Sequence, residues 1–181
     1  MRVLGIDPGS RLMGFGCVDR VGNQVRHVAH GTLRILQSLE GSSDRIADRL
    51  LVIHQQLSEV ILKLKPQIMV IEEVFFAKNA LSALKLGQAR GAAILTGKIH
   101  GLTIEEYAPT AVKRAIVGHG QADKEQVAKM VQLIIGKRTF ETADASDALA
   151  LAICHAQMVR LPPELRVEFG LNSQGKKDVK L

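Results

Sequence analysis

The sequence predicts an α/β fold built on a five-stranded mixed sheet, in which three antiparallel strands are followed by parallel strands and helices flank the sheet. Three observations predict it. β-rich segments open the chain, helical periodicity begins at about residue 43, and short apolar strands alternate with helices after Pro66. With 181 residues, one domain is expected. We assign it to residues 1–163 and expect a loosely ordered polar tail over 164–181.

Three strands are predicted in the first 35 residues. Arg2–Asp7 is β-rich and is stopped by the turn residues Pro8-Gly9-Ser10. Met13–Asp19 forms the second strand. A turn at Val21-Gly22-Asn23 then leads to the third strand, Val25–Ile35. Short turns between the strands favour antiparallel pairing.

A long amphipathic helix is predicted from Ser43 to Pro66, because apolar residues recur at three- and four-residue spacing. The remaining elements come from apolar runs, capping signals and small-residue patterns. They are a strand over Gln67–Glu72, a helix over Asn79–Lys98, a strand over Thr103–Tyr107, a short helix opened by Pro109, a helix capped by Asp123 with Gln126, and a last helix over Asp144–Met158.

Composition is that of an ordinary globular protein, with 46% hydrophobic and 23% charged residues. The longest apolar runs are far too short to cross a bilayer, and no secretory signal is visible, so we expect a cytoplasmic protein without membrane contact. Cys17 and Cys154 lie in apolar segments, and we expect them to be buried free thiols.

The net charge of +6 favours a polyanionic partner. Most of the excess lies between residues 73 and 138, which contain ten Lys or Arg and five Asp or Glu. A merely solubilising surface is the alternative explanation.

Two acids end apolar strands. Asp7 closes the first strand and Glu72 closes the fourth, and ligands in open α/β sheets bind at such strand ends. If the two strands are parallel neighbours, the two carboxylates lie side by side and need a cation. Glu73 is expected to turn to the opposite face.

Asp144 and Asp147 open the last helix at a spacing that puts both on one helix face. They could instead serve only as capping or dipole-compensating acids. The helix is rich in alanine, so its axis can lie close to the sheet and bring both acids to the strand ends. Four carboxylates would then converge. An oxygen-only site suits Mg²⁺ or Mn²⁺ rather than zinc, and we expect two Mg²⁺ ions bridged by Asp7.

Three stretches resemble the RuvC family of Holliday-junction resolvases. They are Gly5-Ile6-Asp7-Pro8-Gly9-Ser10, the run from Ile71 through Glu72 and Asn79 to Gly91, and Ala143-Asp144-Ala145-Ser146-Asp147-Ala148-Leu149-Ala150. The resemblance extends from residue 1 to about 160 and weakens between 20 and 66. It implies a ribonuclease-H-like fold.

The resemblance also implies roles for individual residues. Its catalytic, metal-binding carboxylates fall on Asp7, Glu72, Asp144 and Asp147, and some family members have a histidine near the fourth position. Lys113 and Lys124 match positions near the cut phosphate, Lys124 with a catalytic role. Phe75 matches an aromatic residue that stacks on a base, whereas Phe76 is expected in the core. Further DNA contacts are expected from the basic residues Lys78, Lys85 and Arg90.

A four-way junction needs two symmetrical cuts, and this chain has residues for one active site. A homodimer is therefore expected, with its interface implied along the helix over 79–98, where Ala83, Gly87 and Gly91 allow close packing. Packing within the monomer is the alternative. The family resemblance further implies four-way junction DNA as substrate, ends bearing 5′-phosphate and 3′-hydroxyl groups, a role in recombination and repair, and a branch-migration partner, the RuvA–RuvB complex.

Three alternatives stay open. A ribonuclease-H-like nuclease could act on RNA instead of DNA. A sugar-kinase-like ATPase shares the Gly-Ile-Asp-Pro-Gly-Ser loop, although the chain lacks a second phosphate loop. A non-catalytic module that binds branched DNA would keep the fold and the basic charge without cutting.

Overall fold

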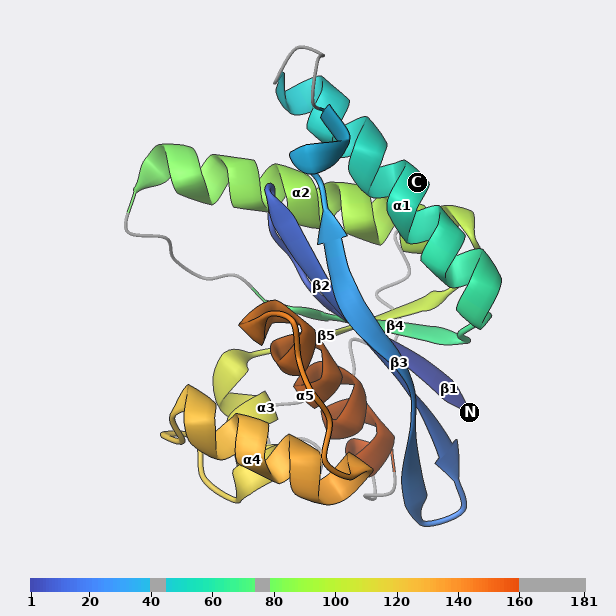
Figure 1. The fold of residues 1–181 in the computed structure, drawn as a ribbon, viewed down its shortest axis with the longest axis vertical. Coiled ribbons are helices and arrows are strands. Elements are labelled where there is room, and N and C mark those ends of the chain that lie inside the picture. Colours follow the sequence, from blue (N-terminus) through green and yellow to red (C-terminus); the bar gives the residue numbers. More distant parts are fainter. Residues whose placement is uncertain (40–44, 74–78, 160–181) are drawn as a thin grey trace, which may run out of the picture.

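A single five-stranded mixed sheet forms the centre of the computed structural model, with strand order β3-β2-β1-β4-β5 (Figure 1). The structure describes residues 1–39, 45–73 and 79–159. β1 pairs with β2 and β2 with β3 in antiparallel fashion, whereas β4 is parallel to both β1 and β5. The predicted α/β fold with a mixed sheet is confirmed. The strands are β1 (Arg2–Asp7), β2 (Leu12–Val21), β3 (Gln24–Arg34), β4 (Ile68–Glu72) and β5 (Thr103–Tyr107).

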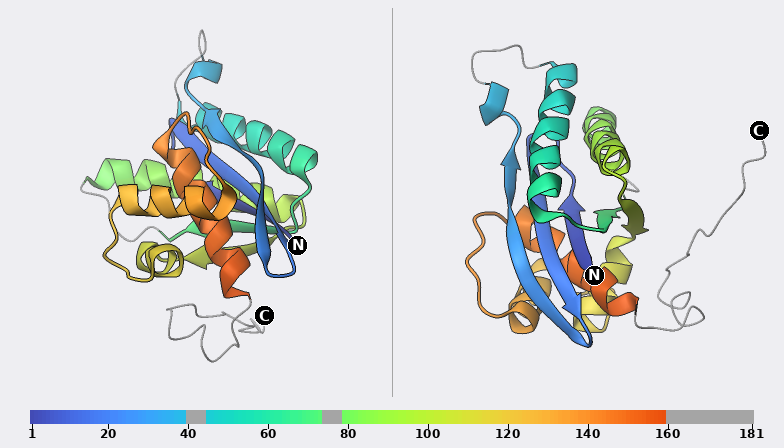
Figure 2. Two further views of the ribbon diagram at one scale, coloured as in Figure 1. Left: turned by 60° about the horizontal axis from the view of Figure 1, so that its bottom comes forward. Right: turned by 90° about the vertical axis from the view of Figure 1, so that its right-hand side faces the viewer.

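Within the described residues, five α-helices and one 3-10 turn connect and cover the strands. α1 and α2 lie on one face of the sheet, and α3, α4 and α5 lie on the other, as the views in Figures 1 and 2 show. The turn η1 spans Gln37–Leu39. The helices are α1 (Ile46–Leu64), α2 (Ala80–Ile99), α3 (Pro109–Val117), α4 (Lys124–Ile135) and α5 (Ala143–Met158).

Strand alternation divides the apolar side chains into two cores. Leu4 and Ile6 of β1 join the cluster under α1 and α2, whereas Val3 joins the cluster under α3, α4 and α5. On β4, Met69 and Ile71 face the first cluster and Val70 faces the second. Odd-numbered residues of β1 and even-numbered residues of β4 therefore point toward α5.

The helix boundaries follow local signals. Asp123 caps α4 by accepting a hydrogen bond from the Gln126 backbone, and the Gln126 side chain accepts one from the Asp123 backbone, so the predicted capping box is confirmed. Pro109 occupies the first turn of α3. Asn79 caps α2. The predicted starting residue of α1, Ser43, and the tail over 164–181 lie outside the described residues.

The α5 backbone lies against the sheet at the glycines of β1 and β2. A Cβ added at Gly5 would stand 2.0 Å from the Ala148 carbonyl oxygen, and one added at Gly14 would stand 2.1 Å from the Asp144 carbonyl oxygen. Both distances are impossible for real atoms, so these strand positions accept only glycine. The close approach of α5 to the sheet therefore depends on the glycines of the strands as well as on the alanines of the helix.

Two smaller observations complete the fold. Both cysteines are buried and free, as predicted. None of the helices in the described part of the chain is long and apolar enough to cross a membrane.

Gly5→Ala is expected to lower the free energy of unfolding by about 3 kcal/mol, because the new methyl group meets the α5 backbone, which cannot yield like a side chain. Urea unfolding measures the change. Gly120→Ala is the matched control, since its Cβ would meet nothing closer than 3.4 Å and its effect should stay within about 0.5 kcal/mol. Equal stability of Gly5→Ala and the parent protein would contradict the close packing of α5.

Candidate active site

Two carboxylates lie at the carboxyl ends of adjacent parallel strands. Asp7 ends β1 and Glu72 ends β4, and both occupy the next position after the paired residues Ile6 and Ile71. Alternate residues of a strand point to the same face, so Asp7 points to the same face as Val3, and Glu72 to the same face as Val70. Val3 and Val70 face α5. The strand register thus brings Asp7 and Glu72 together on the α5 side of the sheet.

The first turn of α5 brings two more acids to this edge. Thr142 caps the helix through its hydroxyl oxygen, which accepts a hydrogen bond from the Ala145 backbone. The Thr142 and Thr32 hydroxyls are 2.6 Å apart, which ties the helix start to β3. Asp144 and Asp147 follow on the first turns, and the Asp144 backbone lies directly over Gly14 of β2.

A pocket of about 260 Å³ opens where these elements meet. Three of the four predicted acids line it together with both predicted lysines. Asp144 does not line the pocket, although its charge acts on Asp7. The lining residues are Asp7, Glu72, Pro109, Val112, Lys113, Lys124, Val127, Asp147, Ala150 and Leu151.

The four acids share one electrostatic field. Burial, followed by the charges of Asp147, Glu72 and Asp144, raises the pKa of Asp7 to about 7. Burial and the charge of Asp147 also raise the pKa of Glu72. The protein therefore concentrates more negative charge here than its own cations neutralise, which is the condition for binding a divalent cation.

Two lysines partly offset the acidic charge. Lys124 Nζ lies 3.0 Å from Asp147 Oδ2, and this hydrogen bond raises the pKa of the ammonium group. Lys113 extends from α3 into the same pocket, and the charges of Lys124 and Lys113 offset part of the rise in the pKa of Glu72. Both cations stand beside the acids, so an anionic group entering the pocket would meet ammonium as well as carboxylate groups.

The donor chemistry fits a hard divalent cation. Oxygen ligands suit Mg²⁺ and Mn²⁺, and no histidine or cysteine lines this pocket. Among the residues that the structure describes, no three Asp, Glu, His or Cys side chains stand at metal-ligand spacing. The acids are close enough to perturb one another but do not form a closed ligand shell, so side-chain adjustment would accompany metal binding.

The structure places the remaining predicted DNA-contact residues in different positions. Phe75, Phe76 and Lys78 lie outside the described residues. Lys85 lines a different pocket, near Ser10. Arg90 donates a 3.0 Å hydrogen bond to the Glu72 carbonyl oxygen and forms an ion pair with Glu106.

Sequence reasoning missed the structural role of Arg90, which holds the end of β4 at the point where Glu72 projects. It also missed Thr32 and Thr142, whose contact fixes the start of α5. No local pattern marks these long-range contacts. Gly14 and Gly16 carried a usable signal, because glycines at alternate positions of one strand mark a face against which a backbone packs.

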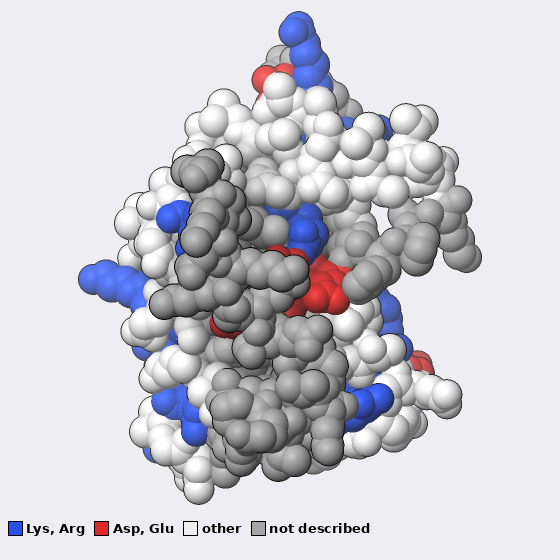
Figure 3. All heavy atoms as spheres, turned by 180° about the vertical axis from the view of Figure 1, so that it is seen from behind, with Lys and Arg blue, Asp and Glu red and all other residues white. Residues whose placement is uncertain are grey.

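One face of the molecule is mixed in charge. Figure 3 shows acidic side chains gathered near the middle of one face, with basic side chains on either side. Acidic and basic side chains therefore both reach the surface on this face.

Comparison with known proteins identifies close relatives. A family model described as crossover junction endodeoxyribonuclease RuvC matches residues 3–155. The crossover junction endodeoxyribonuclease RuvC of Geobacter sulfurreducens is 48% identical over 166 residues, which cover 92% of this chain and 98% of that protein.

Solved structures agree with this similarity. The structure of T. thermophilus RuvC in complex with a Holliday junction substrate has a TM-score of 0.78 and 34% identity, covering 88% of this chain and 95% of that one. The yeast mitochondrial Holliday junction resolvase has a TM-score of 0.64 with 12% identity, covering 86% of this chain and 78% of that one, and so shares the fold.

Asp7→Asn is expected to raise the Tm of the metal-free protein at pH 8.5. Because the pKa of Asp7 is about 7 in the folded state and about 4 when unfolded, the folded protein binds more protons between these values, and stability falls as pH rises through this window. Partial exposure screens the effect, so we expect about 2 kcal/mol, or roughly 4–8 °C.

Thermal unfolding in EDTA at pH 8.5 and pH 4.5 measures the difference, which should largely vanish at the lower pH. Glu59→Gln, at an exposed position of α1, serves as the control and should shift Tm at neither pH. A lower Tm for Asp7→Asn at pH 8.5 would contradict the raised pKa of Asp7.

Proposed function

The chain belongs to the RuvC family of crossover junction endodeoxyribonucleases, and on this basis we propose that it resolves four-way DNA junctions by paired symmetrical nicks. The observation that carries the proposal is the pocket in which Asp7, Glu72 and Asp147 meet Lys113 and Lys124. Carboxylates for a metal and cations for a phosphate are the two requirements of metal-dependent phosphodiester hydrolysis. A non-catalytic binding module would need only the cations.

We propose that Asp7, Glu72, Asp144 and Asp147 hold two Mg²⁺ ions, for which Mn²⁺ substitutes. The raised pKa values of Asp7 and Glu72 support this assignment, because burial and the neighbouring acids both disfavour the ionised carboxylates unless a cation is bound. Ions bound in this way activate water and stabilise the leaving oxygen of a phosphodiester. Asp7 is the proposed bridging ligand, since the other three acids all act on it.

The lysines serve the phosphate in this proposal. Lys124 donates a hydrogen bond to Asp147, and its exposed ammonium group would be able to contact a phosphate if Asp147 held a cation instead. Lys113 lies on the opposite helix of the pocket, α3, and contributes a second positive charge to the same anion. Breakage of the bond between phosphorus and the 3′ oxygen leaves 5′-phosphate and 3′-hydroxyl ends.

Paired cutting requires two copies of the site, and we propose a homodimer that uses α2. Gly87 and Gly91 are exposed, and a Cβ added at either would meet nothing within 4 Å, so neither packs against the described part of the chain. Leu84 and Leu95 are also exposed on this helix. Small and apolar residues at one surface suit close helix packing between two copies. Phe75, just before α2, is the proposed base-stacking residue, and the RuvA–RuvB complex is the proposed branch-migration partner.

Asp7→Asn is expected to reduce cleavage of a synthetic four-way DNA junction in Mg²⁺ by about 10³-fold, roughly 4 kcal/mol of transition-state stabilisation, while junction binding is retained. Single-turnover cleavage and a gel-shift assay measure the two properties. Removal of Mg²⁺ by EDTA should abolish cleavage by the parent protein.

Glu59→Gln is the control and should cut at the parental rate. An RNA duplex and an RNA–DNA hybrid, tested beside the junction, separate the proposal from ribonuclease activity. Near-normal cutting by Asp7→Asn, or faster cutting of either RNA substrate, would refute the assignment.

Gly87→Arg is expected to convert the dimer to a monomer without unfolding it, because the new side chain clashes only with a second copy. Light scattering gives the mass, and a cruciform plasmid reports whether paired cuts become single nicks. Leu133→Arg, at a 76% exposed position of α4, is the matched control. A dimeric Gly87→Arg protein that still makes paired cuts would exclude the α2 interface.

A further inference from the structure

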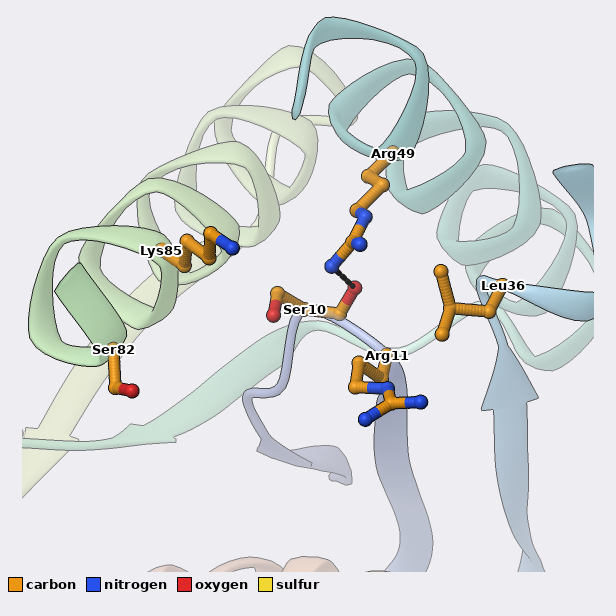
Figure 4. Close-up of a pocket in the computed structure, with 6 residues that line it drawn as sticks. All are labelled: Ser10, Arg11, Leu36, Arg49, Ser82 and Lys85. Atoms are coloured by element: carbon orange, nitrogen blue, oxygen red, sulfur yellow. Dashed lines mark hydrogen bonds between the residues drawn. The ribbon is translucent and has the colours of Figure 1, made fainter. Parts of the chain in front are cut away.

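Side chains from distant elements hold the backbone next to the proposed metal ligands. Arg49 of α1 donates a hydrogen bond of 3.4 Å to the carbonyl oxygen of Ser10, in the turn that follows β1 (Figure 4). Arg90 of α2 holds the Glu72 carbonyl oxygen at the end of β4 in the same way. A third anchor, on β3, acts on the chain segment that leads into α5.

The segment from 136 to 142, which joins α4 to α5, lies at the β3 edge of the sheet (Figure 2). Three alternate residues of β3, which share one face of the strand, contact it. The contacts are His30 Nε2 to the Thr139 carbonyl oxygen at 3.2 Å, the Thr32 hydroxyl to the Thr142 hydroxyl at 2.6 Å, and an exposed ion pair of Arg34 with Glu141 at 3.6 Å.

The contact with Thr139 belongs to a chain of two hydrogen bonds. His30 Nδ1 lies 2.8 Å from Nε2 of His27. A carbonyl oxygen only accepts, so Nε2 of His30 donates to Thr139, and Nδ1 of the neutral His30 ring accepts from His27. Burial, together with the neighbouring His30 and Arg138, lowers the pKa of His27, which favours the neutral ring that this chain needs.

A β-bulge brings the two histidines to the same side of β3. The register with β2 shifts between Cys17 and Val18, which leaves Val28 of β3 as an extra residue. Side chains three positions apart on a regular strand point to opposite faces, and the extra residue turns His27 back to the side of His30. The irregularity of β3 therefore has a definite result, because it builds the hydrogen-bond chain.

The far end of the segment lies beside the carboxylate site. Thr142 caps α5 two positions before Asp144. Phe140 and Thr142 also help to line a hollow of about 240 Å³ together with Lys124 and Asp147. A displacement of the segment would therefore move the start of α5 and change the surroundings of the ion pair between Lys124 and Asp147.

We infer that His27 and His30 are positioning residues for the proposed metal site. By holding the Thr139 carbonyl oxygen on β3, they set where α5 begins and therefore where Asp144 and Asp147 stand relative to the strand acids. The inference rests on the proposed function. Neither histidine is among the described residues that line the carboxylate pocket, so their effect is expected on cation affinity rather than on contact with DNA.

Mn²⁺ binding at pH 8, followed through the electron paramagnetic resonance signal of the free ion, tests the inference without any cleavage. His30→Phe keeps a ring against Phe140, whose centroid is 5.2 Å from that of His30, but removes both hydrogen bonds. Its half-saturating Mn²⁺ concentration should rise about tenfold. Junction affinity in EDTA should change less than about twofold, because no phosphate contact is lost.

Cleavage separates positioning from chemistry. In His30→Phe the Mg²⁺ concentration for half-maximal cutting should also rise about tenfold, whereas the rate at saturating Mg²⁺ should return to within about threefold of the parental rate. A parental Mn²⁺ affinity in His30→Phe would overturn the inference.

Two substitutions at position 27 test the hydrogen-bond chain itself. His27→Gln retains an N–H group that can donate to His30 Nδ1 and should bind Mn²⁺ within about twofold of the parent, whereas His27→Leu should lose about tenfold. Equal Mn²⁺ affinities of these two variants would show that the chain does not position the acids.

His100→Phe is the matched control for a purely structural role. It removes a contact of 2.8 Å between His100 Nε2 and the Ser58 hydroxyl, which joins α1 and α2 on the other face of the sheet. It should lower the free energy of unfolding but leave Mn²⁺ affinity unchanged, and an equal loss of affinity in this variant would overturn the inference. Absence of Mn²⁺ binding by the parent protein would refute the proposed metal site itself, so the two failures are distinguishable.

Discussion

The contact between the α5 backbone and the glycines of β1 and β2 is the constraint on which the rest of the site depends. Asp144 and Asp147 belong to a helix, whereas Asp7 and Glu72 belong to strands, and only a helix without intervening side chains brings the two groups to one edge. Gly5 and Gly14 remove the side chains on the sheet side, and alanines remove them on the helix side. The contact between Thr32 and Thr142 then fixes where the helix begins.

This arrangement opposes the stability of the folded protein. Burial and mutual repulsion raise the pKa of Asp7, so the ionised form costs folding free energy that the apolar cores on both faces must offset. Lys124 offsets part of the repulsion through Asp147. A metal ion bound by these acids would reduce much of the remaining repulsion. Cation binding would therefore stabilise the folded protein.

Much of the fold could be predicted from periodicity and turn residues. Strand β5 was predicted with the observed boundaries, and parity placed Glu72 correctly because β1 and β4 are parallel neighbours. β2 runs longer than predicted, since pairing with β3 extends it beyond its apolar residues. The roles of Arg90 and Arg49 could not be predicted, because their partners lie 18 and 39 residues away and no local pattern specifies them.

The sheet also works as a partition between two apolar cores that share no buried side chain. The layer of α3, α4 and α5 supports the proposed carboxylate chemistry, and the layer of α1 and α2 supports the proposed contact between copies. Because core substitutions that have no common neighbours act independently on stability, the effects of substitutions in the two layers on the free energy of unfolding are expected to add. A substitution in the core beneath α1 and α2 can therefore change the surface of that layer while the core that positions the four carboxylates stays the same.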